Sequence, residues 1–154
     1  MTSLLLFVLI VVAGIILIVE IIPDASFRDL QRENTYIANT LMEPGFPLNW
    51  TNETVLIPGI AKDHRINKTK LFAFSNLSYN QQKTTLQVSG EFLFFFRNAT
   101  DIYNLTQCNY GYPAPVNASC HINLTGIEKR HVITTTRLVI YDGEPVLMEV
   151  QSWI

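Results

Sequence analysis

Charged residues are scarce in this chain, and their scarcity narrows the possible functions. Only 16 % of the 154 residues are charged, and the formal net charge is −2. This sparse, balanced charge offers no basic patch to attract nucleic acid, so we expect no nucleic-acid partner. We expect part of the weakly charged surface to be covered by sugar or by neighbouring subunits.

Motifs for catalysis are also missing. His64, His121 and His131 have no serine or cysteine partner in a nucleophile motif, and Asp63-His64-Arg65 is expected to be a solvated loop. The chain has no phosphate-binding glycine-rich loop, no HExxH and no EF-hand pattern. We therefore expect no enzyme activity, no metal site and no cofactor other than covalent N-linked glycans.

There are only two cysteines, Cys108 and Cys120, and the segment between them contains proline and glycine. An even number of cysteines in an exported domain predicts a disulfide that closes this loop, contributing about 3 kcal/mol at most. The alternative, a metal site that adds His121, lacks a plausible tetrahedral ligand set.

No lysine or arginine precedes Arg28, yet residues Leu4 to Ile22 form a 19-residue apolar run broken only by Gly14 and Glu20. As a helix the run would span about 28 Å, the thickness of a hydrocarbon core. A removable signal peptide is not expected, because the basic flank and the small-residue cleavage site are missing. Either a basic leader has been removed and residue 1 is the mature start, or the run is a signal anchor beginning at Met1.

Beyond Pro23 the chain predicts an amphipathic helix that ends at Pro44-Gly45. Together with the apolar run it predicts one long helix over about 3–42, kinked near Pro23. Its stripe is expected to lie against the β domain or against neighbouring helices. The stripe residues, spaced by three and four positions, are Phe27, Leu30, Asn34, Ile37 and Leu41.

From residue 53 onward the hydrophobic period changes to two, which predicts strands. Asp142-Gly143 predicts a tight hairpin turn. The predicted strands are 55–57, 70–74, 84–96, 132–141 and 146–153. With no helical pattern between them, we expect an α+β fold: a long hydrophobic helix in a first domain, 1–43, and an antiparallel, Ig-like β-sandwich in a second, 44–154.

Glycosylation sequons are strongly enriched. Eight of the twelve asparagines start an N-x-[ST] triplet, whereas chance would give between one and two. Such an excess indicates an exported domain with these asparagines on exposed loops or strand edges. The predicted sites are Asn49, Asn52, Asn67, Asn76, Asn98, Asn104, Asn117 and Asn123.

The order of these parts resembles the archaeal type IV pilin and archaellin superfamily. The resemblance is carried by residues 3–12, which are apolar from Leu4 onward, by Pro23, by the junction 41–47 and by the C-terminal 150–153. It implies an extracellular filament subunit with a leader-cleaved hydrophobic helix, a glycosylated β head and a role in adhesion. This chain contains no basic leader, and Leu5 stands where bacterial-type pilins carry glutamate.

The resemblance further implies that subunits wait in the membrane until an assembly machine builds them into a helical homopolymer. Gly14, with Ala13, would let neighbouring helices approach closely. The residues expected in the filament core are Leu4, Leu5, Phe7, Val8, Val11, Val12, Gly14, Ile15, Ile18 and Ile22.

Two other interpretations stay open. The chain could be a membrane-anchored domain acting as an archaellum stator or binding the surface layer. In a filament, Phe27, Leu30, Ile37 and Leu41 should be buried between subunits, whereas an anchored domain needs them only against its own head. A tethered lectin would instead use exposed aromatics such as Trp50, Tyr110 or Tyr112. The phenylalanines Phe92, Phe94, Phe95 and Phe96 are expected in a β core.

Overall fold

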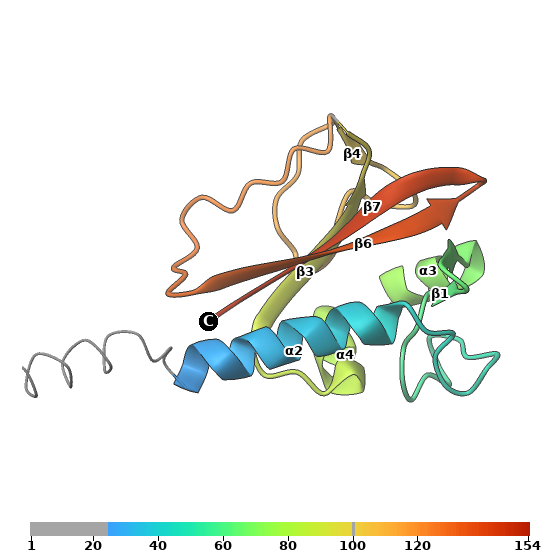
Figure 1. Ribbon diagram of the computed structural model, residues 1–154, viewed down its shortest axis with the longest axis horizontal. Helices are drawn as coiled ribbons and strands as arrows, with labels where there is room; N and C mark the ends of the chain where they lie inside the picture. The colour runs from blue at the N-terminus through green and yellow to red at the C-terminus, as the bar shows by residue number, and fades with distance from the viewer. Residues whose placement is uncertain (1–24, 100) are drawn as a thin grey trace, which may run out of the picture.

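The computed structural model describes residues 25–99 and 101–154, in which helices cover one face of a single mixed sheet (Figure 1). The sheet has seven strands in the order β1-β2-β6-β7-β3-β4, and β5 also pairs with β3. The elements are α2 Ala25–Leu41, β1 Ala61–Lys62, β2 Arg65–Ile66, α3 Lys68–Ser75, α4 Tyr79–Leu86, β3 Glu91–Arg97, β4 Ile102–Tyr103, β5 Tyr110–Gly111, β6 Val132–Tyr141 and β7 Glu144–Trp153.

Three long strands form the centre of the sheet. β7 pairs antiparallel with both β6 and β3, and within residues 25–99 and 101–154 the only parallel pairing joins Arg65 of β2 to Ile140 of β6. The predicted strand 132–141 is confirmed as β6, and the Asp142-Gly143 turn leads directly into β7 as predicted. Both turn residues have positive φ, which matches the twist of a hairpin.

The strand β3 is buried on both faces. Phe92, Phe94 and Phe96 pack in the main core beneath the helices. Leu93 and Phe95 point to the opposite face, where they pack with Trp153. A strand that is covered on both sides has a continuous apolar sequence, as β3 does. These phenylalanines are therefore core residues, as expected.

The predicted β-sandwich is wrong. The second face of the sheet is covered by a loop rather than by a second sheet, and half-buried Tyr112, Ile122 and Leu124 of that loop pack on it. A loop provides apolar side chains without strand pairing, and this is sufficient to cover the single apolar strand β3.

The predicted fold class is also wrong about a long hydrophobic helix, since α2, α3 and α4 are all short or amphipathic. Residues 25–99 and 101–154 contain no helix with the length and apolarity to cross a membrane. The part of the prediction concerning residues 3–24, including the kink near Pro23, lies outside the described residues.

The predicted amphipathic helix is present as α2, and its stripe faces the sheet. Leu30, Ile37 and Leu41 are buried within this single chain. Phe27 is half-buried and its ring lies edge-on to His131 at 5.6 Å. Of the two positions expected for the stripe, Leu30, Ile37 and Leu41 take the one against the chain's own β domain, so they do not need neighbouring subunits to cover them.

Local caps make one predicted strand and the start of another helical, whereas residues 91–96 of the predicted strand 84–96 are confirmed as β3. The segment 70–74 belongs to α3, whose N-cap Asn67 accepts the N–H of Lys70 at 3.1 Å. The start of 84–96 belongs to α4, which begins with a capping box formed by Ser78 and Gln81. In 55–57, only Ile57 forms a bridge, with Phe46.

Candidate functional site

The described domain has two distinct ends. Ala25, where the preceding apolar run joins, lies at the same end as the C-terminus (Figure 1). At this end the N–H of Arg130 donates to the carbonyl of Ile154 at 2.8 Å. The loop 43–60 lies at the opposite end, so any force or attachment through the apolar run enters the domain along α2.

A buried asparagine joins α2 to the sheet. Asn34 is fully buried, and its amide donates to the carbonyls of Ile133 and Val150 and to the hydroxyl of Ser152 at 3.3, 3.2 and 2.9 Å. Its Oδ1 accepts the hydroxyl of Thr135. One side chain thus hydrogen-bonds to both β6 and β7, which fixes the position of the helix along the sheet.

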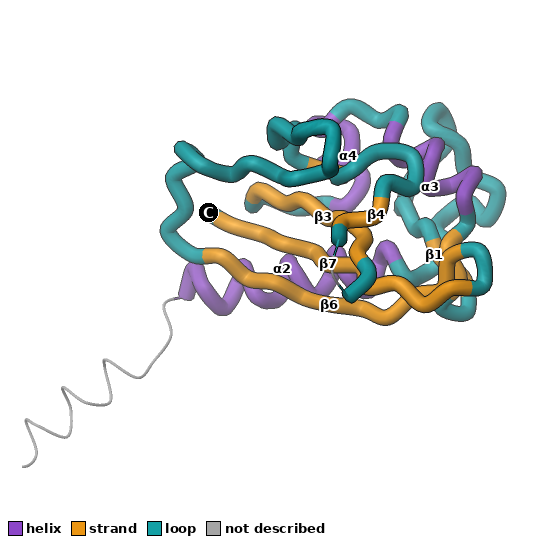
Figure 2. Tube along the Cα trace, turned by 90° about the horizontal axis from the view of Figure 1, so that it is seen from above, coloured by secondary structure: helices purple, strands orange, loops and turns teal. Residues whose placement is uncertain are grey.

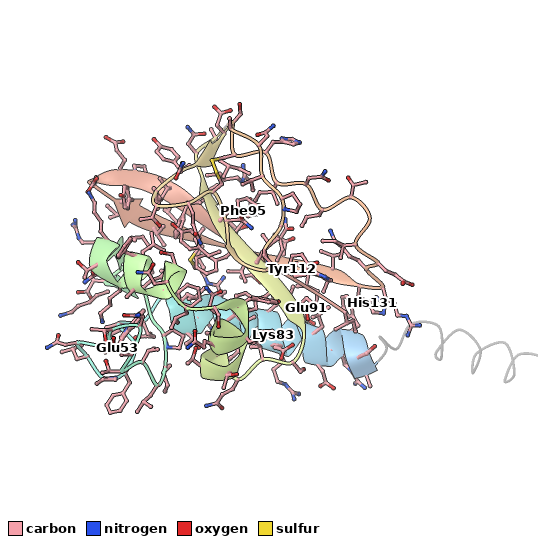
Figure 3. The ribbon with its side chains drawn as sticks, turned by 180° about the vertical axis from the view of Figure 1, so that it is seen from behind. Glu53, Lys83, Glu91, Phe95, Tyr112 and His131 are labelled. Carbon is pink, nitrogen blue, oxygen red and sulfur yellow. A yellow bond between two sulfur atoms is a disulfide. The ribbon has the colours of Figure 1, made fainter. Side chains whose placement is uncertain are left out.

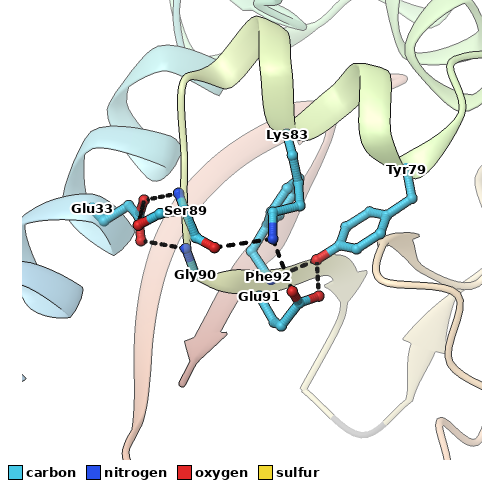
Figure 4. A network of polar contacts seen from close by, with 7 residues as sticks. All are labelled: Glu33, Tyr79, Lys83, Ser89, Gly90, Glu91 and Phe92. Carbon is cyan, nitrogen blue, oxygen red and sulfur yellow. Dashed lines mark hydrogen bonds and ion pairs between the residues drawn. The ribbon is translucent and has the colours of Figure 1, made fainter.

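The next residue toward the N-terminus forms a second tether. The carboxylate of Glu33 accepts the N–H and hydroxyl of Ser89 and the N–H of Gly90, the last at 3.0 Å (Figure 4). These backbone donors lie just before β3. A side chain at Gly90 would meet the Glu33 carboxylate at 2.8 Å, so glycine permits this approach.

A polar cluster beside this tether joins α4 to β3. Lys83 and the hydroxyl of Tyr79 both bind the carboxylate of Glu91, at 2.8 and 2.6 Å (Figure 4). Burial and this hydrogen bond raise the pKa of Tyr79 well above its usual range. For Glu91, burial acts to raise the pKa, but the bonds from Lys83 and Tyr79 prevail and lower it. The cluster thus holds α4 and β3 together.

The predicted disulfide is present. Cys108 and Cys120 are bonded, with their Cα atoms 5.1 Å apart. The closed loop leads into residues 122–127, which cover Leu93, Phe95 and Trp153. The disulfide therefore restrains the segment that covers the second face of the sheet.

The predicted glycosylation sites lie mostly on the surface. Seven of the eight sequon asparagines are exposed, and Asn98 is half-buried. In Asn117 and Asn123 the side-chain oxygen accepts the N–H two residues on, which holds each amide in a local turn at the surface. The glycans themselves remain predictions.

The sequons are unevenly distributed. Asn67 and Asn76 cap the two ends of α3, and the other sites lie in loops or directly after β3 and β4. No sequon lies before Asn49 or after Asn123. The exposed side of α2 and the β6–β7 hairpin therefore contain no predicted glycosylation site, and we refer to them as the sugar-free surface.

The aromatic residues proposed for sugar binding serve in packing instead. Trp50 is buried and its indole N–H is shared between the carbonyls of Pro44 and Gly59 at 3.2 and 3.1 Å. Tyr110 stacks on Phe94 at 4.8 Å. Tyr112, which is labelled in Figure 3, packs edge-on against Trp153 at 5.3 Å. None of the three offers an open platform for a sugar ring.

The remaining candidates do not converge on a reactive site. His64 and His121 are exposed, and among residues 25–99 and 101–154 no three His, Cys, Asp or Glu side chains could share a metal ion. The predicted filament-core residues between Leu4 and Ile22 lie outside the described residues. The sequence pattern marked Asn34 as a polar residue in an apolar stripe, but nothing in it indicated the Glu33 tether. Comparisons with protein-family models, with curated proteins and with solved structures find no match for this chain.

Proposed function

We propose that this chain is a structural subunit of an extracellular filament of the archaeal type IV pilus kind, polymerising through its apolar N-terminal segment. The subunit first sits in the membrane, where an assembly machine extracts it. In the finished filament its partners are other copies of the same chain. The head carries N-linked glycans and serves adhesion. No catalysis is proposed.

The observation that carries this proposal is the separation of the apolar run from the sequons. The run joins α2 at one end of the domain, and the sugar-free surface continues along α2. All eight sequons follow residue 48. A subunit packed among its neighbours through its N-terminal segment would place glycans outward and keep contact surfaces clear of them.

Electron microscopy of material sheared from the cell surface tests the proposal directly. The expected result is a filament whose density fits this sequence, with the apolar residues Leu4 to Ile22 in its core. Recovery of the protein only as a single species in the membrane fraction would overturn it.

The close-packing part of the proposal has its own test. Gly14→Leu is expected to abolish filaments, because a large side chain prevents close helix approach. Val11→Leu, in the same apolar run, is the matched control and should still assemble. An intact Cys108–Cys120 disulfide in both variants shows that the head has folded; normal filaments from Gly14→Leu would refute close packing.

A membrane-anchored surface domain is the second candidate, and one observation favours it. The apolar side chains Leu30, Ile37 and Leu41 of α2 are buried against the chain's own sheet, which is all that an anchored domain requires. The two candidates differ after mechanical shear, since an anchored protein stays with the membrane and a filament is released.

A further inference from the structure

The outer edge of β6 is open over most of its length. β7 pairs with one side of β6 from Val132 to Tyr141. On the other side β2 pairs only at Ile140, whose N–H donates to the carbonyl of His64 at 2.7 Å. Within the described residues, no strand lies beside the edge from Val132 to Leu138, which runs along the margin of the sheet in Figure 2.

The antiparallel pairing of β6 with β7 determines which residues of β6 point their N–H and C=O groups to the open edge. In an antiparallel pair, alternate residues point their N–H and C=O to opposite sides of the strand. Ile140 points its N–H outward, to β2, so the even-numbered residues before it point outward too. These residues are Val132, Thr134, Thr136 and Leu138.

The edge lacks the features that usually block pairing. Natural edge strands carry lysine, proline or bulges, or are short. β6 is ten residues long, has neither proline nor glycine, and has one charged residue, Arg137. The guanidinium of Arg137 is turned to α2, where it donates to Asn39 at 2.9 Å. Val132 and Leu138 are 47 % and 61 % exposed, which leaves two apolar side chains at the two ends of the open edge.

The exposed residues of β6 are self-complementary about Thr135. Antiparallel pairing of two copies about Thr135 puts Val132 beside Leu138 of the second copy. It also puts Thr134 beside Thr136 of the second copy. All four residues point their backbone groups outward, so this register matches donors with acceptors. Apolar and Thr–Thr cross-strand pairs are favourable.

The helix beneath the sheet leaves room for this pairing. Asn34 bonds to both β6 and β7, which places α2 beneath the two strands together. With strands ~4.8 Å apart, a helix midway between them would lie about 10 Å from its counterpart, the usual distance between packed helices. The flank of α2 toward the edge, marked by Phe27 at His131 and Asn39 at Arg137, carries the uncharged Gln31 and Thr35 between them.

We propose that the free edge of β6 pairs antiparallel with the same edge of a second copy of this chain, within the sugar-free surface. α2 and β6 run in the same direction, so the two Ala25 residues lie at opposite ends of the pair. Subunits of one filament share a single direction. The pairing therefore joins two filaments or two cell surfaces, a consequence that rests on the proposed function although the pairing itself does not.

Cross-linking in mild detergent tests the register with the full-length chain. The single variants Val132→Cys and Leu138→Cys are mixed and treated with a short bis-maleimide; the native cysteines do not react because they are disulfide-bonded. The mixture is expected to give a cross-linked dimer, and either variant alone is not. No dimer from the mixture, or equal cross-linking of Val132→Cys alone, would overturn the antiparallel pairing.

A charge test uses the same cross-link as its readout. Thr134→Lys with Thr136→Lys, added to both cysteine variants, places like charges opposite each other in the proposed register. We expect association to weaken about tenfold, equivalent to about 1.4 kcal/mol. Asn80→Lys with Thr84→Lys puts the same two charges on exposed positions of α4 and should change nothing. Equal weakening by both pairs would refute a specific edge contact.

The outcome separates the two proposals. Cross-linking in detergent needs neither a filament nor a membrane, so a positive result stands even when no filament is found on cells. A negative cross-link together with filaments in sheared material would refute the edge pairing and leave the filament proposal intact.

Discussion

At the scale of single residues, the attachment of α2 depends on two adjacent polar side chains. Glu33 binds the segment before β3, and Asn34 binds β6 and β7. Burying a polar group is costly unless its hydrogen bonds are made. Each of these two side chains makes its bonds at only one position of α2 along the sheet. The apolar residues of the stripe supply the burial, while these two side chains determine the register.

Asn34→Ala should therefore destabilise the protein strongly. The substitution leaves the hydroxyls of Thr135 and Ser152 and two carbonyls without their buried partner, and we expect the free energy of unfolding to fall by about 3 kcal/mol. Asn39→Ala on the same helix removes only an exposed bond to Arg137 and should cost about 0.5 kcal/mol or less. Urea unfolding of both full-length variants in mild detergent measures the difference, and equal losses would contradict the role of Asn34.

Acid should weaken the link between α4 and β3. The pKa of Glu91 is lower in the folded protein than its ordinary value of 4.5, so its contribution to stability is present above that value and is lost as pH falls through the folded pKa. In Glu91→Gln we expect stability to decline less steeply below about pH 4.5. Unfolding curves across this range provide the comparison, and parallel declines would show that another carboxylate dominates.

At the scale of elements, the sequence was informative where a local pattern and the tertiary contacts agree. The alternation of β6 and β7 and the Asp142-Gly143 turn predicted the hairpin, and the apolar stripe predicted α2. Lys70 to Phe74 reads as a strand by composition, yet the cap at Asn67 makes it helical. The sandwich was wrong because burial of β3 on both faces does not reveal whether a sheet, a helix or a loop covers it.

The candidate site residues were likewise predictable only where a local pattern indicated them. The disulfide was predictable, since two cysteines in an exported domain have few alternatives. The aromatic sugar platform, which the sequence left open as an alternative, is not supported because Trp50 and Tyr110 are buried. The tether of Glu33 to Ser89 joins residues 56 positions apart, and no pattern in one sequence connects them.

Opening the disulfide should loosen the loop on the second face. With Cys108→Ser and Cys120→Ser the unfolded chain gains loop entropy, and we expect a loss of about 3 kcal/mol at most. The loop then covers Trp153 less well. In a Trp50→Phe background, acrylamide quenching of Trp153 should increase when the disulfide is removed. Unchanged quenching would mean that the loop holds its place through packing alone.

At the scale of the whole molecule, the predicted glycans divide the surface into a covered part and a clear part. The clear part holds the outer side of α2 and the open edge of β6, and the covered part holds α3 and the long loops. Bulky sugars limit association to the surfaces they leave free. The arrangement therefore favours contacts along one side of the molecule.

Site occupancy should follow exposure. Asn98 is the one sequon asparagine that is half-buried, and its side-chain oxygen also accepts the N–H of Asp101 at 2.7 Å. If sugar is added to the folded domain, we expect Asn98 to be the least occupied site and the exposed Asn52 to be among the most occupied. Mass spectrometry of glycopeptides measures this directly, and full occupancy of Asn98 would indicate attachment before folding.

The shared direction of α2 and β6 has a mechanical consequence. A pull on the chain at Ala25, with the sheet held along β6, draws the helix lengthwise over the strands. The hydrogen bonds of Glu33, Asn34 and Asn39 then share the shear force, so all of them must break before the helix moves. Tension applied across the same contacts would open them one after another, so the domain resists most along the axis on which its N-terminal segment pulls.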